Sequence, residues 1–127
     1  MEYTLENLDV FITAENLSNK IWDLIIDKDW FVKSTVGKQL VNSSDSISAN
    51  IAEGYGRYSF KDDSRFLIIS RGSLLETKSW IRKCKARKIF SEADADSLLE
   101  ELETIKKKLN GYINFVEKGI PKSKPKE

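Results

Sequence analysis

The stretch SEADADSLLEELETIKKKLNGYINFVEKG, residues 91–119, decides the fold of this chain. Its apolar residues recur at alternating spacings of four and three, so they share one face of an α-helix. Ser91 with Asp94 three residues later is a capping-box pattern that predicts the start of the helix, and Gly119, followed by Pro121, predicts its end. The apolar face consists of Leu98, Leu102, Ile105, Leu109, Tyr112 and Val116.

Weaker apolar stripes at helical spacing predict three more helices upstream. The first covers residues 5–27 and the second residues 34–55, with the apolar run Trp30-Phe31-Val32 between them as a connector that must pack on something. The third begins at Ser59, again with a capping-box pattern. Its predicted buried face consists of Phe66, Ile69, Ser73, Thr77, Trp80, Ile81 and Cys84.

Short connections between the four predicted helices favour an all-α fold, an antiparallel up-down-up-down four-helix bundle. We expect residues 1–119 to form this single domain and residues 120–127 to form a basic, disordered tail. Gly72 and Ser73 place small side chains in the middle of the third helix. Small residues there lower helix propensity, so they predict a packed crossing where another backbone approaches closely.

The composition of the 127 residues excludes much catalytic chemistry. The chain has no histidine and a single cysteine, Cys84, so Ser–His and Cys–His nucleophiles, His-ligated zinc and Cys-only zinc are all excluded. No apolar run approaches the roughly 18 residues that a membrane span needs, and no signal-peptide pattern opens the chain. We therefore expect a cytoplasmic protein that is not an enzyme, with no cofactor, no metal and no membrane contact.

The formal net charge of +1 hides a strong segregation of charge along the chain. Residues 1–30 carry seven acids and two bases, whereas residues 71–88 carry seven bases and one acid. Clustered positive charge attracts nucleic-acid phosphates whatever the base sequence, and the Lys106-Lys107-Lys108 run would add to it. The alternative is that acidic and basic faces neighbour one another within the bundle and form weak surface ion pairs.

The most unusual stretch is SISANIAEGYGR, residues 46–57, at the end of the second predicted helix. Its glycines superficially resemble a dinucleotide-binding loop, but a third glycine is missing and a helix precedes them instead of a strand. We expect glycine here to close the helix in the left-handed conformation. Asn50, Glu53 and Arg57 share a helical face. They form either a polar network that fixes this helix end to the next helix, or a site where Arg57 contacts a ligand or nucleic acid.

The same stretch carries a family resemblance. The chain resembles the pattern of the four-helix bundle proteins named after the 23S rRNA intervening sequence. The likeness is carried by Ser46-Ile47 and residues 50–57, then by Ser59, Asp62 and Arg65-Phe66-Leu67, and then by Arg71-Gly72-Ser73-Leu74-Leu75-Glu76. The first and last predicted helices match in length and pattern, so the likeness extends over nearly the whole chain. Its structural motif consists of Ser46, Asn50, Glu53, Gly54, Gly56, Gly72 and Ser73.

The resemblance implies a four-helix bundle that assembles into a ring-shaped homopentamer. The similar accessory variability determinant of diversity-generating retroelements is a basic pentamer that binds nucleic acid and a reverse transcriptase, which implies RNA, DNA or such a protein as partners. The matching motif implies Arg57, Arg65 and Arg71 as candidate nucleic-acid contacts. The basic cluster that follows them adds Arg82, Lys83, Lys85, Arg87 and Lys88.

These observations lead to two hypotheses about function. The first is a non-enzymatic, oligomeric accessory protein that binds RNA or DNA through basic helix ends. The alternative is a protein-interaction scaffold that engages a polymerase or another protein partner without direct nucleic-acid contact.

Overall fold

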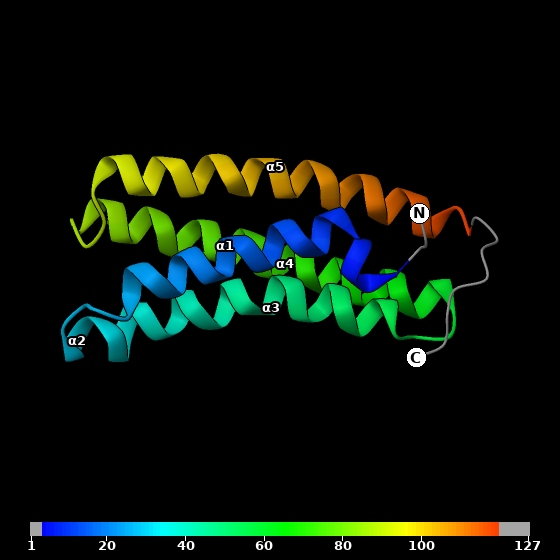
Figure 1. Ribbon diagram of the computed structural model, residues 1–127, viewed down its shortest axis with the longest axis horizontal. Helices are drawn as coiled ribbons and strands as arrows, with labels where there is room; N and C mark the ends of the chain where they lie inside the picture. Colours follow the sequence, from blue (N-terminus) through cyan, green and yellow to red (C-terminus); the bar gives the residue numbers. More distant parts are fainter. Residues whose placement is uncertain (1–3, 120–127) are drawn as a thin grey trace.

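Four long helices lie side by side in the computed structural model, which describes residues 4–119 (Figure 1). They are α1 (Asp9–Ile25), α3 (Lys38–Tyr55), α4 (Phe60–Ala86) and α5 (Glu92–Glu117), preceded by a short 3-10 turn, η1 (Leu5–Asn7). Each long helix runs antiparallel to the one before it, and α1 and α4 each pack against both α3 and α5. The predicted all-α, up-down-up-down four-helix bundle is confirmed.

One hydrophobic core is shared by the four long helices. All six apolar residues of the stripe predicted in residues 91–119 are buried in it. Packing of this stripe stabilises α5, because most of a helix's stability in a protein comes from burying its apolar face. Residues 120–127, for which the sequence predicts a basic tail, lie outside the described residues.

The junction between α1 and α3 differs from the prediction of an apolar connector. Trp30–Val32 is a helical turn, α2, which continues through the π-helical turn η2 (Lys33–Gly37) directly into α3. The Asp29 carboxylate caps this helix by accepting a hydrogen bond from the Val32 amide at 2.9 Å. The missed signal is this acidic cap, which starts the helix before the predicted position.

The two aromatic side chains of α2 are mostly exposed in the part of the chain that the structure describes. Val32 contacts the core, but Trp30 is 77% and Phe31 69% exposed. The prediction that this run packs is therefore wrong for both aromatic side chains. They leave apolar surface in water at the end of the bundle.

Both predicted capping serines are confirmed. The Ser59 hydroxyl accepts a hydrogen bond from the Asp62 amide at the start of α4, and the Ser91 hydroxyl accepts one from the Asp94 amide at the start of α5, each at 3.1 Å. α5 ends shortly before Gly119, whose φ of 57° is the left-handed conformation typical of a glycine after a helix.

The glycines of the motif act differently from the prediction. α3 ends where expected, but Gly56 has a φ of −74°, which any residue can adopt. Glycine is required at position 54 because α3 and α4 approach each other closely there. A Cβ on Gly54 would lie 2.6 Å from Asp63 Oδ1 and 2.9 Å from the Asp63 carbonyl oxygen. The predicted close approach at Gly72 is wrong, since that residue is exposed and a Cβ would meet nothing within 4 Å.

The buried face of α4 is displaced by one residue from the predicted face in the first half of the helix. Ile69 is exposed and Phe66 is half-buried, whereas their neighbours Leu67 and Ser70 are buried. Ser70 can lie in the core because its hydroxyl donates to the Ile47 carbonyl of α3 at 2.7 Å. Apolar residues on several sides of α4 leave its face ambiguous from spacing alone.

Candidate nucleic-acid interface

A layer of hydroxyl groups joins α3 to α4 within the motif. The Ser73 hydroxyl donates to Ser46 Oγ at 2.9 Å, and the Asn50 amide donates to that oxygen and to the Ser46 carbonyl, each at 2.8 Å. One turn along α4, the Thr77 hydroxyl is 3.0 Å from Ser43 Oγ. These short side chains satisfy one another where the two helices cross. The contacts favour a structural role for Ser46, Asn50 and Ser73.

Arg57 lies just beyond the end of α3 and contacts both α3 and α4. Its guanidinium is 3.2 Å from the Glu53 carboxylate and lies over the Phe66 ring, 4.6 Å from the centroid. A cation over an aromatic face at an exposed site gains about 0.5–1 kcal/mol. The geometry favours the polar network that fixes the end of α3 to α4. Asn50 is not part of that network, because its amide turns to Ser46.

The other two arginines of the motif are also engaged. Arg65 pairs with Asp62 at 3.5 Å on the exposed face of α4, and Arg71 donates to the Asn110 side-chain oxygen of α5 at 3.2 Å. Because an α-helix rises about 1.5 Å per residue, Arg65 and Lys85 lie roughly 30 Å apart along α4. The candidate cations therefore form two separate groups, and the motif arginines do not join the basic cluster.

The basic half of α4 lies beside the acidic first half of α5, and this neighbour neutralises part of it. Lys85 Nζ is 2.6 Å from Asp96 Oδ1, and this hydrogen bond raises the pKa of Lys85. Lys78 Nζ is 3.8 Å from the Glu103 carboxylate. The alternative of ion pairs between neighbouring faces therefore holds for the two lysines that face α5.

Pairing also occurs between α1 and α5. Lys108, at the end of the lysine run of α5, lies 2.8 Å from the Asp9 carboxylate and donates to the Thr13 hydroxyl at 3.1 Å. Lys20 pairs with Glu101 at 2.8 Å. The lysine run therefore does not extend the basic surface of α4 as one block, and part of the acidic charge of α1 is neutralised.

Four cations at the end of α4 are exposed and have no acidic partner within residues 4–119. We call this cluster the basic end of α4; it consists of Arg82, Lys83, Arg87 and Lys88. Lys83 Nζ lies 5.9 Å from the centroid of the Trp80 ring. Lys88 follows the helix with a left-handed φ of 59°, so it begins the turn into α5. Unneutralised positive charge thus gathers at one end of the bundle.

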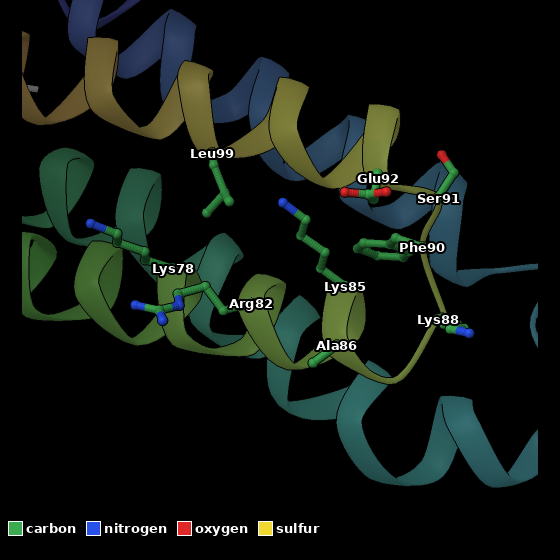
Figure 2. A pocket seen from close by; sticks show the side chains of 9 residues that line it. All are labelled: Lys78, Arg82, Lys85, Ala86, Lys88, Phe90, Ser91, Glu92 and Leu99. Atoms are coloured by element: carbon green, nitrogen blue, oxygen red, sulfur yellow. The ribbon is translucent and has the colours of Figure 1, made fainter.

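A hollow of about 1080 Å³ opens between the basic end of α4 and the start of α5 (Figure 2). Lys78, Arg82 and Lys85 line it from α4, and Phe90 and Leu99 add apolar surface. Lys85 extends from α4 toward Leu99, across the space between the two helices (Figure 2). Sequence reasoning missed Lys78 and the apolar part of this site. Leu99 lies next to the apolar stripe of α5 in the sequence, and this position could have indicated apolar surface at the edge of the core.

Cys84, the one thiol of the chain, is placed away from any surface. Burial raises its pKa to about 11, so little thiolate is present at neutral pH. Among residues 4–119, no three His, Cys, Asp or Glu side chains come together in a way that would hold a metal ion. No helix in this part of the chain is long and apolar enough to cross a membrane.

The family model described as 23S rRNA-intervening sequence protein matches residues 6–111. The chain belongs to this family. The matched residues include the hydroxyl layer between α3 and α4, the whole of α4 and most of α5. The resemblance noted in residues 46–76 is therefore confirmed. No curated protein matches the chain.

A solved structure shares the fold of this chain. It is a protein with unknown function from the S23 ribosomal protein family of Bacteroides thetaiotaomicron. The two align with a TM-score of 0.74 and 23% sequence identity, over 82% of this chain and 97% of that chain. At this identity the likeness establishes the fold alone.

Proposed function

We propose that this protein is a non-enzymatic, oligomeric accessory protein that binds RNA or DNA through the basic end of α4. One observation carries the proposal: these four cations stay exposed without an acidic partner within residues 4–119, although the neighbouring helix α5 begins with acids. Isolated surface ion pairs contribute little, but several unneutralised cations close together attract a phosphate backbone at low salt.

The chemistry of the remaining side chains supports binding rather than catalysis. The chain has no histidine, and its one thiol, Cys84, is buried with a raised pKa. A nucleophilic cysteine needs an accessible site and a lowered pKa, which is the opposite environment. Asp96, a carboxylate near the basic end of α4, pairs with Lys85.

We further propose that the chain assembles into the homopentamer that its family resemblance implies. Large apolar side chains left exposed near the junction of α1 and α2 support assembly, because water-exposed patches of this kind mark interfaces. They are Trp22, Ile26, Trp30 and Phe31. Light scattering at micromolar concentration is expected to give five times the chain mass of 14.6 kDa. A monomeric mass would contradict this proposal.

The nucleic-acid proposal is tested by the salt dependence of binding. The purified protein is titrated against a short structured RNA and a DNA duplex between about 50 and 200 mM salt, where phosphate contacts weaken most visibly. Replacement of all four cations of the basic end by glutamine is expected to abolish the binding seen at low salt. Absence of binding by the unmodified protein would contradict the proposal.

A matched control removes four exposed cations elsewhere on the bundle. It replaces Lys61, Lys106, Lys107 and Lys118 by glutamine, which changes the net charge by the same amount. We expect this variant to lose far less affinity than the variant of the basic end. Equal losses would show a diffuse charge effect and contradict the assignment to α4.

The alternative function is a scaffold for a polymerase, such as a reverse transcriptase, or for another protein. Trp30 and Phe31 favour it, because two aromatic side chains exposed on one turn form a surface that suits a protein partner. A pulldown whose partner survives nuclease treatment and is lost on Trp30→Ser would support the scaffold. A partner released by nuclease would favour the nucleic-acid function.

A further inference from the structure

We propose that the basic end of α4 takes nucleic acid as a single strand, with phosphates on its cations and unpaired bases in a series of hollows across α4. This inference rests on the proposed nucleic-acid binding and names the class of strand that the same surface recognises.

Two of the hollows share a wall on α4. The first, of about 1080 Å³, lies between α4 and α5, and the second, of about 490 Å³, lies along α4 itself. Lys78 and Arg82 line both, so these two cations separate one hollow from the other. They are four residues apart and project from successive turns of one helical face. A phosphate bound to Arg82 would have a hollow on each side for the adjoining bases.

A third hollow continues the series toward α3. It has a volume of about 370 Å³ and lies between α4 and the segment that runs from η2 into α3, with Thr35 and Gln39 on one side and Trp80 and Arg87 on the other. Lys83 lines both the second and the third hollow. A cation therefore stands at each boundary in the series.

Each hollow has apolar or aromatic surface in its wall. Phe90 and Leu99 line the first, Leu75 lines the second, and Trp80 lines the third. Base faces can pack on apolar surface of this kind, and the half-buried Trp80 offers an aromatic ring for stacking, whereas Phe90 is only 3% exposed. The hollows also reach the size of ordinary small-ligand sites, which begins at roughly 300 Å³.

A duplex would contact only the cations of this surface and not its apolar walls. Its bases are paired and stacked inside, so it offers mainly phosphates to a protein surface of this charge. The cations of α4 would contact those phosphates, but the apolar walls between them would stay in water. A single strand can turn its bases into the hollows while its phosphates meet the cations. The alternation of cations and hollows therefore favours the single strand.

The experiment compares a short, unstructured RNA strand with the duplex formed from the same strand and its complement, at matched salt and with the intact protein. We expect the single strand to bind at least about tenfold more tightly, since it adds base contacts to the phosphate contacts. Equal affinities would overturn this inference and leave nucleic-acid binding in place. Binding of neither probe would overturn the proposed function as well.

Paired substitutions on one helix test the hollows themselves. Leu75→Ala removes the apolar wall of the second hollow, and Ile68→Ala, two turns away on the same face, removes a similarly exposed side chain that lines none of the three. Leu75→Ala is expected to weaken single-strand binding about fivefold, because apolar contact with a base is lost, and to leave duplex binding unchanged. Equal effects of the two substitutions would overturn the placement of bases in the hollows.

An acidic protein segment is the competing occupant of these hollows. In that case Arg82→Gln would leave single-strand affinity unchanged and would alter the mass measured by light scattering, because the segment would come from another copy of the chain. That result would overturn the inference. We expect Arg82→Gln to preserve the mass and to reduce the slope of log affinity against log salt by about 0.7, the value for one lost phosphate contact on a single strand.

Discussion

Ser73 on α4 and Ser46 on α3 place their hydroxyl oxygens 2.9 Å apart, and this hydrogen bond marks the centre of the contact between the two helices. On either side, Ser70 bonds to the Ile47 carbonyl and Thr77 lies within hydrogen-bond distance of Ser43. Short side chains let the two helices approach closely, and their hydroxyls bond to one another or to a backbone carbonyl where the contact is half-buried or buried. The stability of the α3–α4 pair therefore depends on small polar groups as well as on apolar packing.

Thr77→Val tests this hydroxyl layer. Thr77 is fully buried, and its hydroxyl lies 3.0 Å from Ser43 Oγ and 2.8 Å from the Ser73 carbonyl. Valine has nearly the same shape without the hydrogen bond, so we expect the free energy of unfolding to fall by about 1 kcal/mol. The measurement is urea denaturation followed by circular dichroism.

Thr104→Val is the matched control for that substitution. Thr104 is exposed on α5 and bonds only within its own helix, to the Glu100 carbonyl at 3.4 Å. We expect a change within about 0.5 kcal/mol, the usual range for surface substitutions. If both threonines respond equally, the buried hydroxyl layer has no special role in stability.

Gly54 and Gly72 are expected to respond oppositely to alanine. A Cβ at Gly54 would lie 2.6 Å from Asp63 Oδ1, so Gly54→Ala should destabilise the bundle by about 1–3 kcal/mol through overpacking. Gly72 is exposed in mid-helix, and Gly72→Ala should stabilise by about 0.5–1 kcal/mol through helix propensity. Thermal unfolding of both variants is the measurement, and we expect the lower melting temperature for Gly54→Ala. A lower melting temperature for Gly72→Ala would contradict the close approach at Gly54.

Asp96→Asn is expected to strengthen nucleic-acid binding. Asp96 pairs with Lys85 at 2.6 Å beside the first hollow, and its removal frees a positive charge next to the basic end of α4. Fold stability should change by less than about 1 kcal/mol, because the pair is exposed. Affinity at low salt is the measurement, with Asp23→Asn on α1 as an exposed acid whose loss should have a smaller effect. Unchanged affinity after Asp96→Asn would argue against binding near this pair.

The burial of Cys84 predicts that the stability of the fold falls at alkaline pH. Its pKa is raised to about 11 in the folded protein, against about 8.5 in an unfolded chain. The folded state therefore keeps the thiol proton up to a higher pH than the unfolded state. The contribution of the protonated thiol to stability is complete below about pH 8.5 and declines as the pH rises toward 11. Between pH 8 and 10 we expect the stability of the unmodified protein to fall by about 1–2 kcal/mol more than that of Cys84→Ala.

Thiol labelling gives an independent check of the same residue. At pH 8 the native protein should react with a thiol reagent far more slowly than the denatured protein, because the buried thiol is protonated and inaccessible. Rapid labelling of the native protein would show that α4 opens at this position.

The sequence predicted correctly those features that depend on neighbours within one helical turn. The caps at Ser59 and Ser91 are of this kind, and so is the apolar stripe of α5. The face of α4 was mispredicted at Ile69 because apolar residues occur on several sides of that helix. Only the position of α3 shows that Ser70, rather than Ile69, points inward.

The candidate site was predicted only as a set of cations. Sequence patterns named Arg57 and Arg82 alike, although Arg57 contacts Glu53 and Phe66 while Arg82 has no acidic partner within residues 4–119. The two hollows beside Arg82 are lined by residues 75–99, and the sequence did not predict them because their shape depends on how the side chains of α4 and the start of α5 pack together.

The sequence by itself determined the four helices, the segregation of charge and the absence of histidine chemistry, because each of these is local or compositional. The tertiary structure alone decided which cations remain free to meet a partner. Lys83 and Lys85 are two residues apart, which is about 200° around the helix, so they face opposite sides of α4. Lys85 meets Asp96 on α5 and is neutralised, whereas Lys83 faces the hollows toward α3 and keeps its charge.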